Sequence, residues 1–215
     1  MTYLYPWMLF LGYLLGNFTE TEITYIRKAF FFARKAHHGK NRLDGSPYFN
    51  HVVCAALFPL SLRVYDVDLI VTILLHDTVE ESKAISHALL QRLFGIENAN
   101  RVLMLTKPKN KSGEFYFMSL LGCDDWRVLL AKLFDRLHNQ QTISAGKPAW
   151  QKRKNKETVR YFPRILKRAE AQVLLAIQKK KVSKEVYGTV CEEIRKLYLK
   201  VIPEPYKHYF KKNNL

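Results

Sequence analysis

Cysteine is scarce in this sequence and is not arranged for pairing. The three cysteines, Cys54, Cys123 and Cys191, are odd in number and widely spaced, and no C-x-x-C pair is present. This pattern argues against a disulfide framework or a zinc finger as the basis of the fold. A reducing environment fits best, so we expect a cytoplasmic protein.

Long apolar runs are missing as well. The apolar stretch from Tyr3 to Leu15 is shorter than the ~20 residues that a membrane-spanning helix needs. It also lacks the basic region and the small-residue cleavage site of a signal peptide. We interpret residues 1–18 as an apolar N-terminal segment that packs on the domain or on a second subunit. A membrane-surface anchor is the alternative.

Repeats, low-complexity tracts and alternating strands and helices are also absent, and nearly every segment favours helix. Thr19 and Glu22 have the spacing of a capping box, which predicts a helix that starts there and ends at Gly39. The other expected helices cover residues 51–62, 66–78, 84–94, 97–105, 126–142, 155–178 and 183–201. With 215 residues and 48% apolar composition, we predict an all-α, single-domain protein over residues 19–201. We interpret residues 202–215 as a frayed basic C-terminal tail.

Positive charge is concentrated in the last third of the chain. The net charge is +16, and residues 147–215 hold 19 of the 35 Lys and Arg but 6 of the 19 Asp and Glu. Such a surface attracts polyanions, whether nucleic acid, an anionic membrane or a highly phosphorylated small molecule. A solvated basic helix surface is the alternative, and charge alone does not separate these interpretations.

Four dispersed residues have the chemistry of a metal site: His51, the adjacent pair His76 and Asp77, and Asp135. Two imidazoles and two carboxylates suit a divalent cation that also binds water and a phosphate, so this set suggests metal-assisted hydrolysis of a phosphate ester. Manganese, iron, cobalt and zinc are all compatible with these ligands.

Further polar residues follow these candidate ligands at helical spacing. Glu80, four residues after His76, and its neighbour Glu81 are candidates to accept a proton from a metal-bound water. Asn139 and Thr142 continue the face that begins at Asp135, where an amide and a hydroxyl can bind a base or ribose. The alternatives are a solvated helix end at the glutamates and a surface ion pair between Asp135 and Arg136.

The order and context of these motifs resemble the HD superfamily of metal-dependent phosphohydrolases, in particular the hydrolase domain of RelA/SpoT-type enzymes and the stand-alone small alarmone hydrolases. The resemblance covers roughly residues 21–167. The matching stretches are A-H-H-G-K-N-R-L-D-G-S-P-Y-F-N-H (36–51), L-L-H-D-T-V-E-E-S (74–82), F-G (94–95), L-T-K (105–107), K-L-F-D-R-L-H-N-Q-Q-T (132–142), E-T (157–158) and Y-F (161–162).

This resemblance implies an HD-domain helical bundle with one Mn²⁺ ion bound by His51, His76, Asp77 and Asp135. It implies that Glu80 and Glu81 activate the attacking water. It also implies removal of the 3′-pyrophosphate from ppGpp or pppGpp, an alarmone nucleotide substrate, giving GDP or GTP and pyrophosphate. Arg42 falls where a basic residue contacts the substrate, and Asn139, Thr142 and Tyr161 fall at nucleoside-side positions.

Four departures from the family pattern bear on substrate choice. Glu81 replaces an Asp and lengthens the arm by one methylene, Val52 replaces a Pro, Leu43 removes a phosphate contact, and Gln141 replaces an Arg. Hydrolysis of adenosine alarmones such as ppApp, or of another nucleotide, therefore stays open. Non-catalytic binding of nucleic acid or membrane is a second alternative, which the basic last third and the apolar N-terminus suggest. We expect no obligatory nucleic-acid partner and no membrane partner. A homo-oligomer, and functional pairing with an alarmone synthetase, are open.

Overall fold

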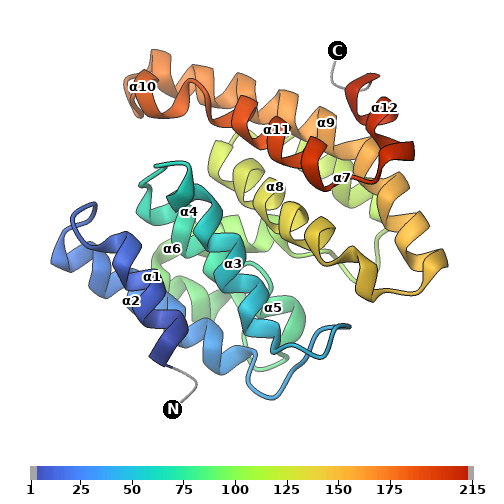
Figure 1. The fold of residues 1–215 in the computed structure, drawn as a ribbon. Helices are drawn as coiled ribbons and strands as arrows, with labels where there is room; N and C mark the ends of the chain where they lie inside the picture. The colour runs from blue at the N-terminus through green and yellow to red at the C-terminus, as the bar shows by residue number, and fades with distance from the viewer. Residues whose placement is uncertain (1–3, 213–215) are drawn as a thin grey trace. The chain divides into compact units, whose positions relative to one another are not determined.

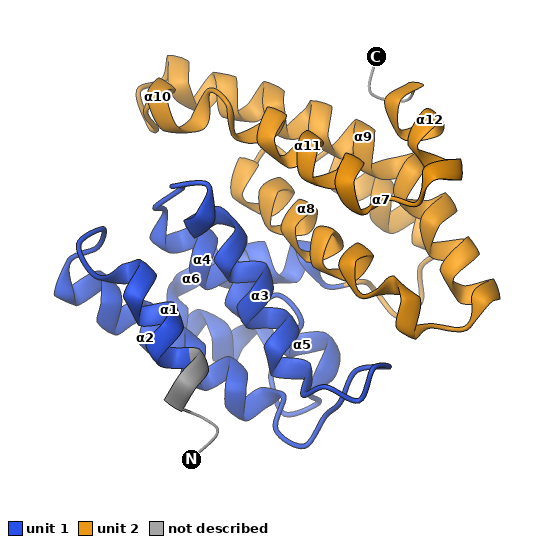
Figure 2. Ribbon diagram, viewed as in Figure 1, with its two compact units in different colours: residues 1–106 blue, residues 107–215 orange. Residues whose placement is uncertain are grey.

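A computed structural model describes residues 4–212, which are helical throughout apart from their connections (Figure 1). The expected all-α fold is confirmed. Within the described residues the only β-type pairing is an isolated antiparallel bridge between Asn41 and Pro47. The chain divides into two compact units, residues 1–106 and residues 107–215 (Figure 2). The predicted boundaries at 18/19 and 201/202 stay predictions.

Unit 1 is built around a short, fully buried helix. The helices of this unit are α1 (Leu4–Leu14), α2 (Glu20–Ala36), α3 (Tyr48–Ser61), α4 (Val67–Leu75), α5 (Thr78–Glu81) and α6 (His87–Leu105). Every residue of α4 from Leu69 to Leu75 is buried, and α2, α3 and α6 pack against it. The run is rich in β-branched residues but is helical because Asp66 caps it, accepting a hydrogen bond from the Leu69 backbone N–H at 2.7 Å.

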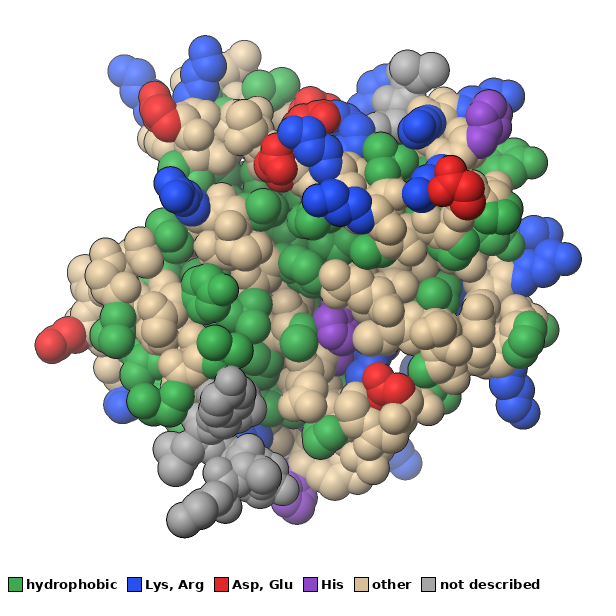
Figure 3. All heavy atoms as spheres, in the orientation of Figure 1, with side chains coloured by type: hydrophobic (Ala, Val, Ile, Leu, Met, Phe, Trp, Pro, Cys, Tyr) green, Lys and Arg blue, Asp and Glu red, His purple; other side chains and the backbone are tan. Residues whose placement is uncertain are grey.

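The apolar N-terminal segment packs on unit 1. Trp7, Phe10 and Leu14 of α1 are buried, α1 packs against α3, and the Trp7 ring meets Phe30 of α2 with centroids 5.0 Å apart. The part of the segment at residues 1–3 lies outside the described residues. The outer side chains of α1 are exposed and apolar, and hydrophobic side chains are visible on this part of the surface (Figure 3). None of the described helices is long and apolar enough to cross a membrane.

Unit 2 is organised by the pairing of its two long helices. Its elements are α7 (Gly113–Leu121), α8 (Trp126–Gln141), the 3₁₀ helix η1 (Ile143–Ala145), α9 (Pro148–Gln178), α10 (Lys184–Tyr187), α11 (Val190–Val201) and α12 (Glu204–Lys212). Helix α8 packs along α9, and α11 covers both. Tyr198 of α11 is fully buried, and its hydroxyl donates to the Leu133 carbonyl oxygen at 2.7 Å.

Three helix boundaries in unit 2 differ from expectation. The frayed tail expected over 202–215 is wrong for residues 204–212, which form α12 and pack on α9. The physical reason is burial of Phe210, which stacks on Tyr198 with centroids 5.3 Å apart. Helix α9 begins earlier than expected because Pro148 occupies its first turn, where a missing N–H costs nothing. The helix expected over 183–201 is split at Gly188 and Thr189.

Candidate active site

A break between α4 and α5 places the adjacent residues His76 and Asp77 together. The sequence predicts a continuous helix through Thr78, in which neighbouring side chains diverge by about 100°. In the structure α4 ends at Leu75, and Asp77 has φ −99° and ψ 0° before α5 begins. The break directs the side chains toward one point, with His76 Nε2 and Asp77 Oδ2 3.0 Å apart. It also means that Glu80 does not follow His76 along one uninterrupted helix face.

His51 completes a cluster of three ligand-type residues in unit 1. One ligand atom from each of His51, His76 and Asp77 lies within 4.8 Å of the others, and His51 Nε2 lies 3.8 Å from Asp77 Oδ2. Both histidines are buried. His76 Nδ1 is 2.7 Å from the Ile73 carbonyl oxygen. This contact fixes a tautomer in which Nδ1 carries the proton and the Nε2 lone pair faces the cluster.

The residues present fit a divalent cation. Two imidazole nitrogens and one carboxylate oxygen form a group that can hold a metal ion. A hydrogen bond from the imidazole to a backbone carbonyl, as in His76, is the usual support of a metal-binding histidine. The carboxylate of Asp77 has comparable support, because the Tyr48 hydroxyl donates to its Oδ2 at 2.7 Å.

The loop between α2 and α3 extends this site with two basic residues. Arg42 N–H donates to the Ser46 carbonyl oxygen at 2.8 Å, and the Arg42 guanidinium lies 5.8 Å from the centroid of the Tyr48 ring. Lys40 Nζ lies 3.0 Å from Glu81 Oε2 and also donates to the Glu81 backbone carbonyl. The loop therefore places the Arg42 side chain near Tyr48, which contacts the cluster, and the Lys40 side chain against Glu81, the candidate proton acceptor.

A third buried histidine, His37, packs against Tyr48, the residue that contacts Asp77 of the cluster. His37 at the end of α2 is 2% exposed and stacks on Tyr48 with centroids 4.9 Å apart. Burial lowers the pKa of His37 to about 4, although the Asp77 charge opposes this shift. We therefore expect neutral His37 in the folded protein throughout the physiological range.

This gives a pH-dependent stability. Because the unfolded chain takes up a proton on His37 near pH 6.5 and the folded protein only near pH 4, stability is present above pH 6.5 and is lost as the pH falls toward 4. The loss amounts to about 3 kcal/mol at most. Urea unfolding of the metal-free protein between pH 4 and 7 measures it. His37→Phe keeps an aromatic ring against Tyr48, and this variant should show a flatter profile; an unchanged profile would contradict the assignment.

Asp135, the fourth predicted ligand, lies in unit 2 on α8. Two side chains of the same helix contact its carboxylate. Lys132 Nζ is 2.8 Å from Asp135 Oδ2, and Asn139 Nδ2 donates to Asp135 Oδ1 at 2.6 Å. Asp135 is buried. Burial alone would lower the pKa of Lys132, but Asp135 outweighs it and holds that pKa well above its usual value. A charged lysine and an amide thus fix the carboxylate.

Other residues of the same motif have structural contacts. Arg136, considered above as half of a surface pair with Asp135, is buried and instead pairs with Glu157 of α9. Gln140 donates to the Thr158 hydroxyl at 2.7 Å in the core. The Thr142 hydroxyl donates to the His138 carbonyl oxygen at 3.2 Å at the end of α8. The second half of this motif therefore joins α8 to α9 as well as placing Asp135 and Asn139.

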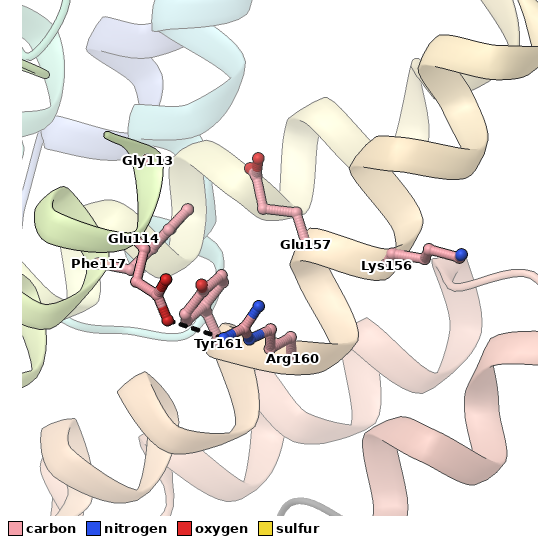
Figure 4. A pocket seen from close by; sticks show the side chains of 7 residues that line it. All are labelled: Gly113, Glu114, Phe117, Lys156, Glu157, Arg160 and Tyr161. Atoms are coloured by element: carbon pink, nitrogen blue, oxygen red, sulfur yellow. Dashed lines mark hydrogen bonds and ion pairs between the residues drawn. The ribbon is translucent and has the colours of Figure 1, made fainter. Parts of the chain in front are cut away.

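Tyr161 lines a pocket of about 250 Å³ between α7 and α9 (Figure 4). Its ring stacks on Phe117 with centroids 4.3 Å apart. Arg160 and Glu114 form an ion pair at 2.8 Å at the pocket wall, drawn as the dashed line in Figure 4. The remaining lining residues are Gly113, Lys156 and Glu157. The pocket offers aromatic surface and groups of both charges, a combination suited to a polar, ring-containing ligand.

Sequence reasoning missed the long-range contacts that hold Asp77, Glu81 and Arg136. Tyr48, Lys40 and Glu157 act across sequence separations of 29, 41 and 21 residues, which no local pattern reveals. Lys132 was detectable in principle, since it precedes Asp135 by three residues on one helix face. Helix α7, which forms one wall of the pocket, was also missed, since no helix was expected between residues 105 and 126.

Comparison with known proteins places this geometry in a family. The HD domain family matches residues 29–170. The bifunctional (p)ppGpp synthase/hydrolase SpoT of Escherichia coli (strain K12) is 29% identical over 152 residues, 66% of this chain and 21% of that protein. A guanosine-3′,5′-bis(diphosphate) 3′-pyrophosphohydrolase of Spiroplasma citri is 34% identical over 158 residues, 69% of this chain and 21% of that protein.

A solved structure shares the fold. It is described as a metazoan ortholog of SpoT that hydrolyses ppGpp, and it superposes with a TM-score of 0.60 at 19% identity, covering 80% of this chain and 94% of that one. The chain belongs to the HD domain family. Its similarity to SpoT and to the 3′-pyrophosphohydrolases agrees with the RelA/SpoT-type resemblance of the sequence motifs. The chain spans about a fifth of the length of the curated relatives it matches.

Proposed function

We propose that this chain is a manganese-dependent hydrolase that removes the 3′-pyrophosphate of guanosine alarmones, converting ppGpp or pppGpp to GDP or GTP and pyrophosphate, in the cytoplasm. The observation that carries the proposal is the cluster of His51, His76 and Asp77. The activity of its relatives, which include guanosine-3′,5′-bis(diphosphate) 3′-pyrophosphohydrolases, supports the choice of substrate.

The metal-binding role falls to His51, His76 and Asp77, with Asp135 as the predicted fourth ligand. A bound divalent ion supplies a Lewis acid for the phosphoryl group and lowers the pKa of water. The protein orients its own ligands: the Ile73 carbonyl sets the His76 tautomer, and the Tyr48 hydroxyl holds Asp77. In unit 2, Lys132 and Asn139 hold Asp135.

The proton-accepting role falls to Glu80 and Glu81. In the proposed reaction a water attacks the phosphorus that is bonded to the ribose 3′-oxygen, and the bond between that phosphorus and the 3′-oxygen breaks to release pyrophosphate. A glutamate takes the proton of the water, and the ribose 3′-oxygen takes up a proton to become the 3′-hydroxyl of GDP or GTP. Glu80 is exposed on α5. Glu81 is half-buried and held by Lys40, which restricts the longer glutamate arm to one position. Lys40 is therefore a positioning residue that acts through Glu81.

Substrate binding falls to four residues. Arg42, which lies beside Tyr48, is the proposed phosphate contact, because a guanidinium matches the geometry of a phosphate group. Asn139 and Thr142 on α8, and Tyr161 in the pocket of unit 2, are the proposed nucleoside contacts. Gln140, which lies between Asn139 and the departure at Gln141, donates a core hydrogen bond to Thr158 and is therefore not proposed as a base contact. Guanosine alarmones are therefore the favoured substrates.

The test is a substrate panel with purified protein and Mn²⁺. Pyrophosphate release and nucleotide products are followed for ppGpp, pppGpp, ppApp, GTP and a cyclic nucleotide. We expect release from ppGpp and pppGpp and none from nucleotides without a 3′-phosphate. Equal turnover of GTP would overturn the proposed substrate class, and no release from any compound across pH and metal conditions would overturn the activity.

Lys40 and Glu81 can be tested as a coupled pair. We expect Glu81→Gln to lower kcat by about 10²-fold or more, the range for loss of a general base. Lys40→Met should lower kcat by about 10- to 100-fold, because small misplacements of a reacting group are costly. The double variant should be no slower than Glu81→Gln alone, since Lys40 acts only through Glu81.

The control for this cycle is Lys35→Met, which removes an exposed lysine of α2 and should leave kcat unchanged. KM for ppGpp is measured alongside. Fully additive losses in the double variant, or a Lys40→Met effect confined to KM, would show that Lys40 binds substrate directly instead of positioning Glu81.

A further inference from the structure

The outer side of α9 carries an unmixed basic face. Between Gln151 and Glu170, every residue of α9 that is exposed is lysine or arginine. These residues, called here the α9 basic face, are Lys152, Arg153, Lys156, Arg160, Arg164 and Lys167. An ordinary solvated helix surface mixes charges of both signs. On α9, by contrast, part of the positive charge of the last third of the chain forms one continuous row.

The acidic residues of this stretch do not neutralise the row. Glu157 is turned inward, where it pairs with Arg136 and Lys154. Glu170 lies 3.6 Å from Arg195 of α11. On the face itself Arg160 pairs with Glu114, and both of these side chains are more than half exposed. Such an exposed pair contributes little and is readily exchanged for another anion.

The length of the row indicates what it can bind. Lys152 and Lys167 are 15 residues apart, which corresponds to about 22 Å at 1.5 Å per residue. Successive members are mostly three or four positions apart and therefore lie about 5–6 Å from one another on one side of the helix. A single nucleotide would cover only part of such a row. A linear polyanion would engage all of it.

The side chains around the row favour nucleic acid over a membrane. Helices that bind in a membrane interface present bulky apolar residues beside their basic ones, and between Gln151 and Glu170 no apolar residue of α9 is exposed. The exposed leucines of this helix, Leu174 and Leu175, follow beyond the end of the face. Arginine forks, by contrast, match phosphate groups.

Helix α7, which packs on α9, adds an exposed aromatic ring that is suited to binding a single-stranded nucleic acid. Phe115 is 49% exposed, and Lys111 Nζ lies 5.2 Å from the centroid of its ring. Phe115 is next to Glu114, which contacts Arg160 on the face. Unpaired bases stack on exposed aromatic rings, whereas the bases of a duplex are already stacked on one another.

We propose that the α9 basic face binds the phosphate backbone of single-stranded RNA. This inference rests on the exposed residues of α9 and α7 and not on the metal cluster. Lys156 and Arg160 also line the pocket that contains Tyr161, so the test leaves these two residues unchanged. Its test therefore uses binding and not turnover.

The experiment measures fluorescence anisotropy of a labelled 20-nucleotide single-stranded RNA with the full chain at 50–300 mM KCl. The face variant is Lys152→Gln/Arg153→Gln/Arg164→Gln. The control, Lys179→Gln/Lys181→Gln/Lys184→Gln, removes the same charge from exposed residues that begin 12 positions beyond Lys167. Glutamine is a good helix former, so both variants should keep the helical circular-dichroism spectrum.

We expect wild-type binding to weaken steeply with salt. The face variant should lose about 30-fold or more in affinity at low salt, and its log–log salt slope should be about 2 smaller, since each phosphate contact to a single strand contributes about 0.7. The control should change affinity by less than about threefold at the same salt. No binding by the wild type, equal losses in the two variants, or tighter binding to duplex DNA or to anionic lipid vesicles would overturn the proposal.

Discussion

Asp77→Asn should abolish Mn²⁺-supported release of pyrophosphate from ppGpp. Asp77 supplies the carboxylate of the three-residue cluster, and asparagine keeps its size but removes its charge. Loss of a hydrogen-bond partner of a metal ligand typically costs about 10–100-fold in activity or affinity. Loss of the ligand's charge should exceed that range, and Mn²⁺ affinity measured by calorimetry should fall with it.

Tyr48→Phe provides the graded comparison. This change removes only the hydroxyl that donates to Asp77 Oδ2, so activity should fall within the range of about 10–100-fold. The matched control is Asp124→Asn, the same chemical change at a carboxylate whose side chain is 82% exposed in unit 2. Wild-type Mn²⁺ affinity in Asp77→Asn would contradict the proposed metal site, as would an Asp124→Asn effect of similar size.

Local signals made much of the fold predictable. The capping box of Thr19 and Glu22 is present at the start of α2. Asp66 and Asp125, at the predicted starts of two helices, cap α4 and α8. Gly95, with φ 80°, interrupts the helical run from His87 to Leu105 because non-glycine residues rarely adopt that conformation. Each of these features is encoded within a few residues, which is why the sequence alone reveals it.

The features that were missed depend on distant contacts. Helix α12 forms because Phe210 is buried against Tyr198, and its own sequence reads as a basic tail. The candidate site shows the same limit. The order of the motifs predicted His51, His76, Asp77 and Asp135 as ligands. It did not predict that α4 ends at Leu75, the break that brings the side chains of His76 and Asp77 together, because such a break depends on packing. Periodicity assumes a straight helix and therefore misjudged how Glu80 lies relative to His76.

Arg136→Met should destabilise unit 2 by about 3 kcal/mol, at the lower end of the ~3–5 kcal/mol lost when one partner of a buried ion pair is removed. Arg136 is buried on α8, pairs with Glu157 of α9 and lies with its guanidinium 4.8 Å from the centroid of the Phe162 ring. Burial alone would raise the pKa of Glu157, but Arg136 and Lys154 hold it below its usual value. Without Arg136 the carboxylate remains desolvated with only Lys154 as its partner.

Urea unfolding at pH 7 measures the loss, and an arginine of α9 offers the control. Arg160→Met removes the same group from the exposed pair with Glu114, whose side chains are 63% and 60% exposed, and should cost at most about 1 kcal/mol. Replacing both members of the inner pair, Arg136→Met/Glu157→Leu, should recover most of the loss, because no desolvated charge is left behind. If Arg136→Met costs no more than Arg160→Met, the pair does not hold α8 against α9. If the double variant is no more stable than the single one, the loss comes from packing of the guanidinium on Phe162 and not from the stranded charge of Glu157.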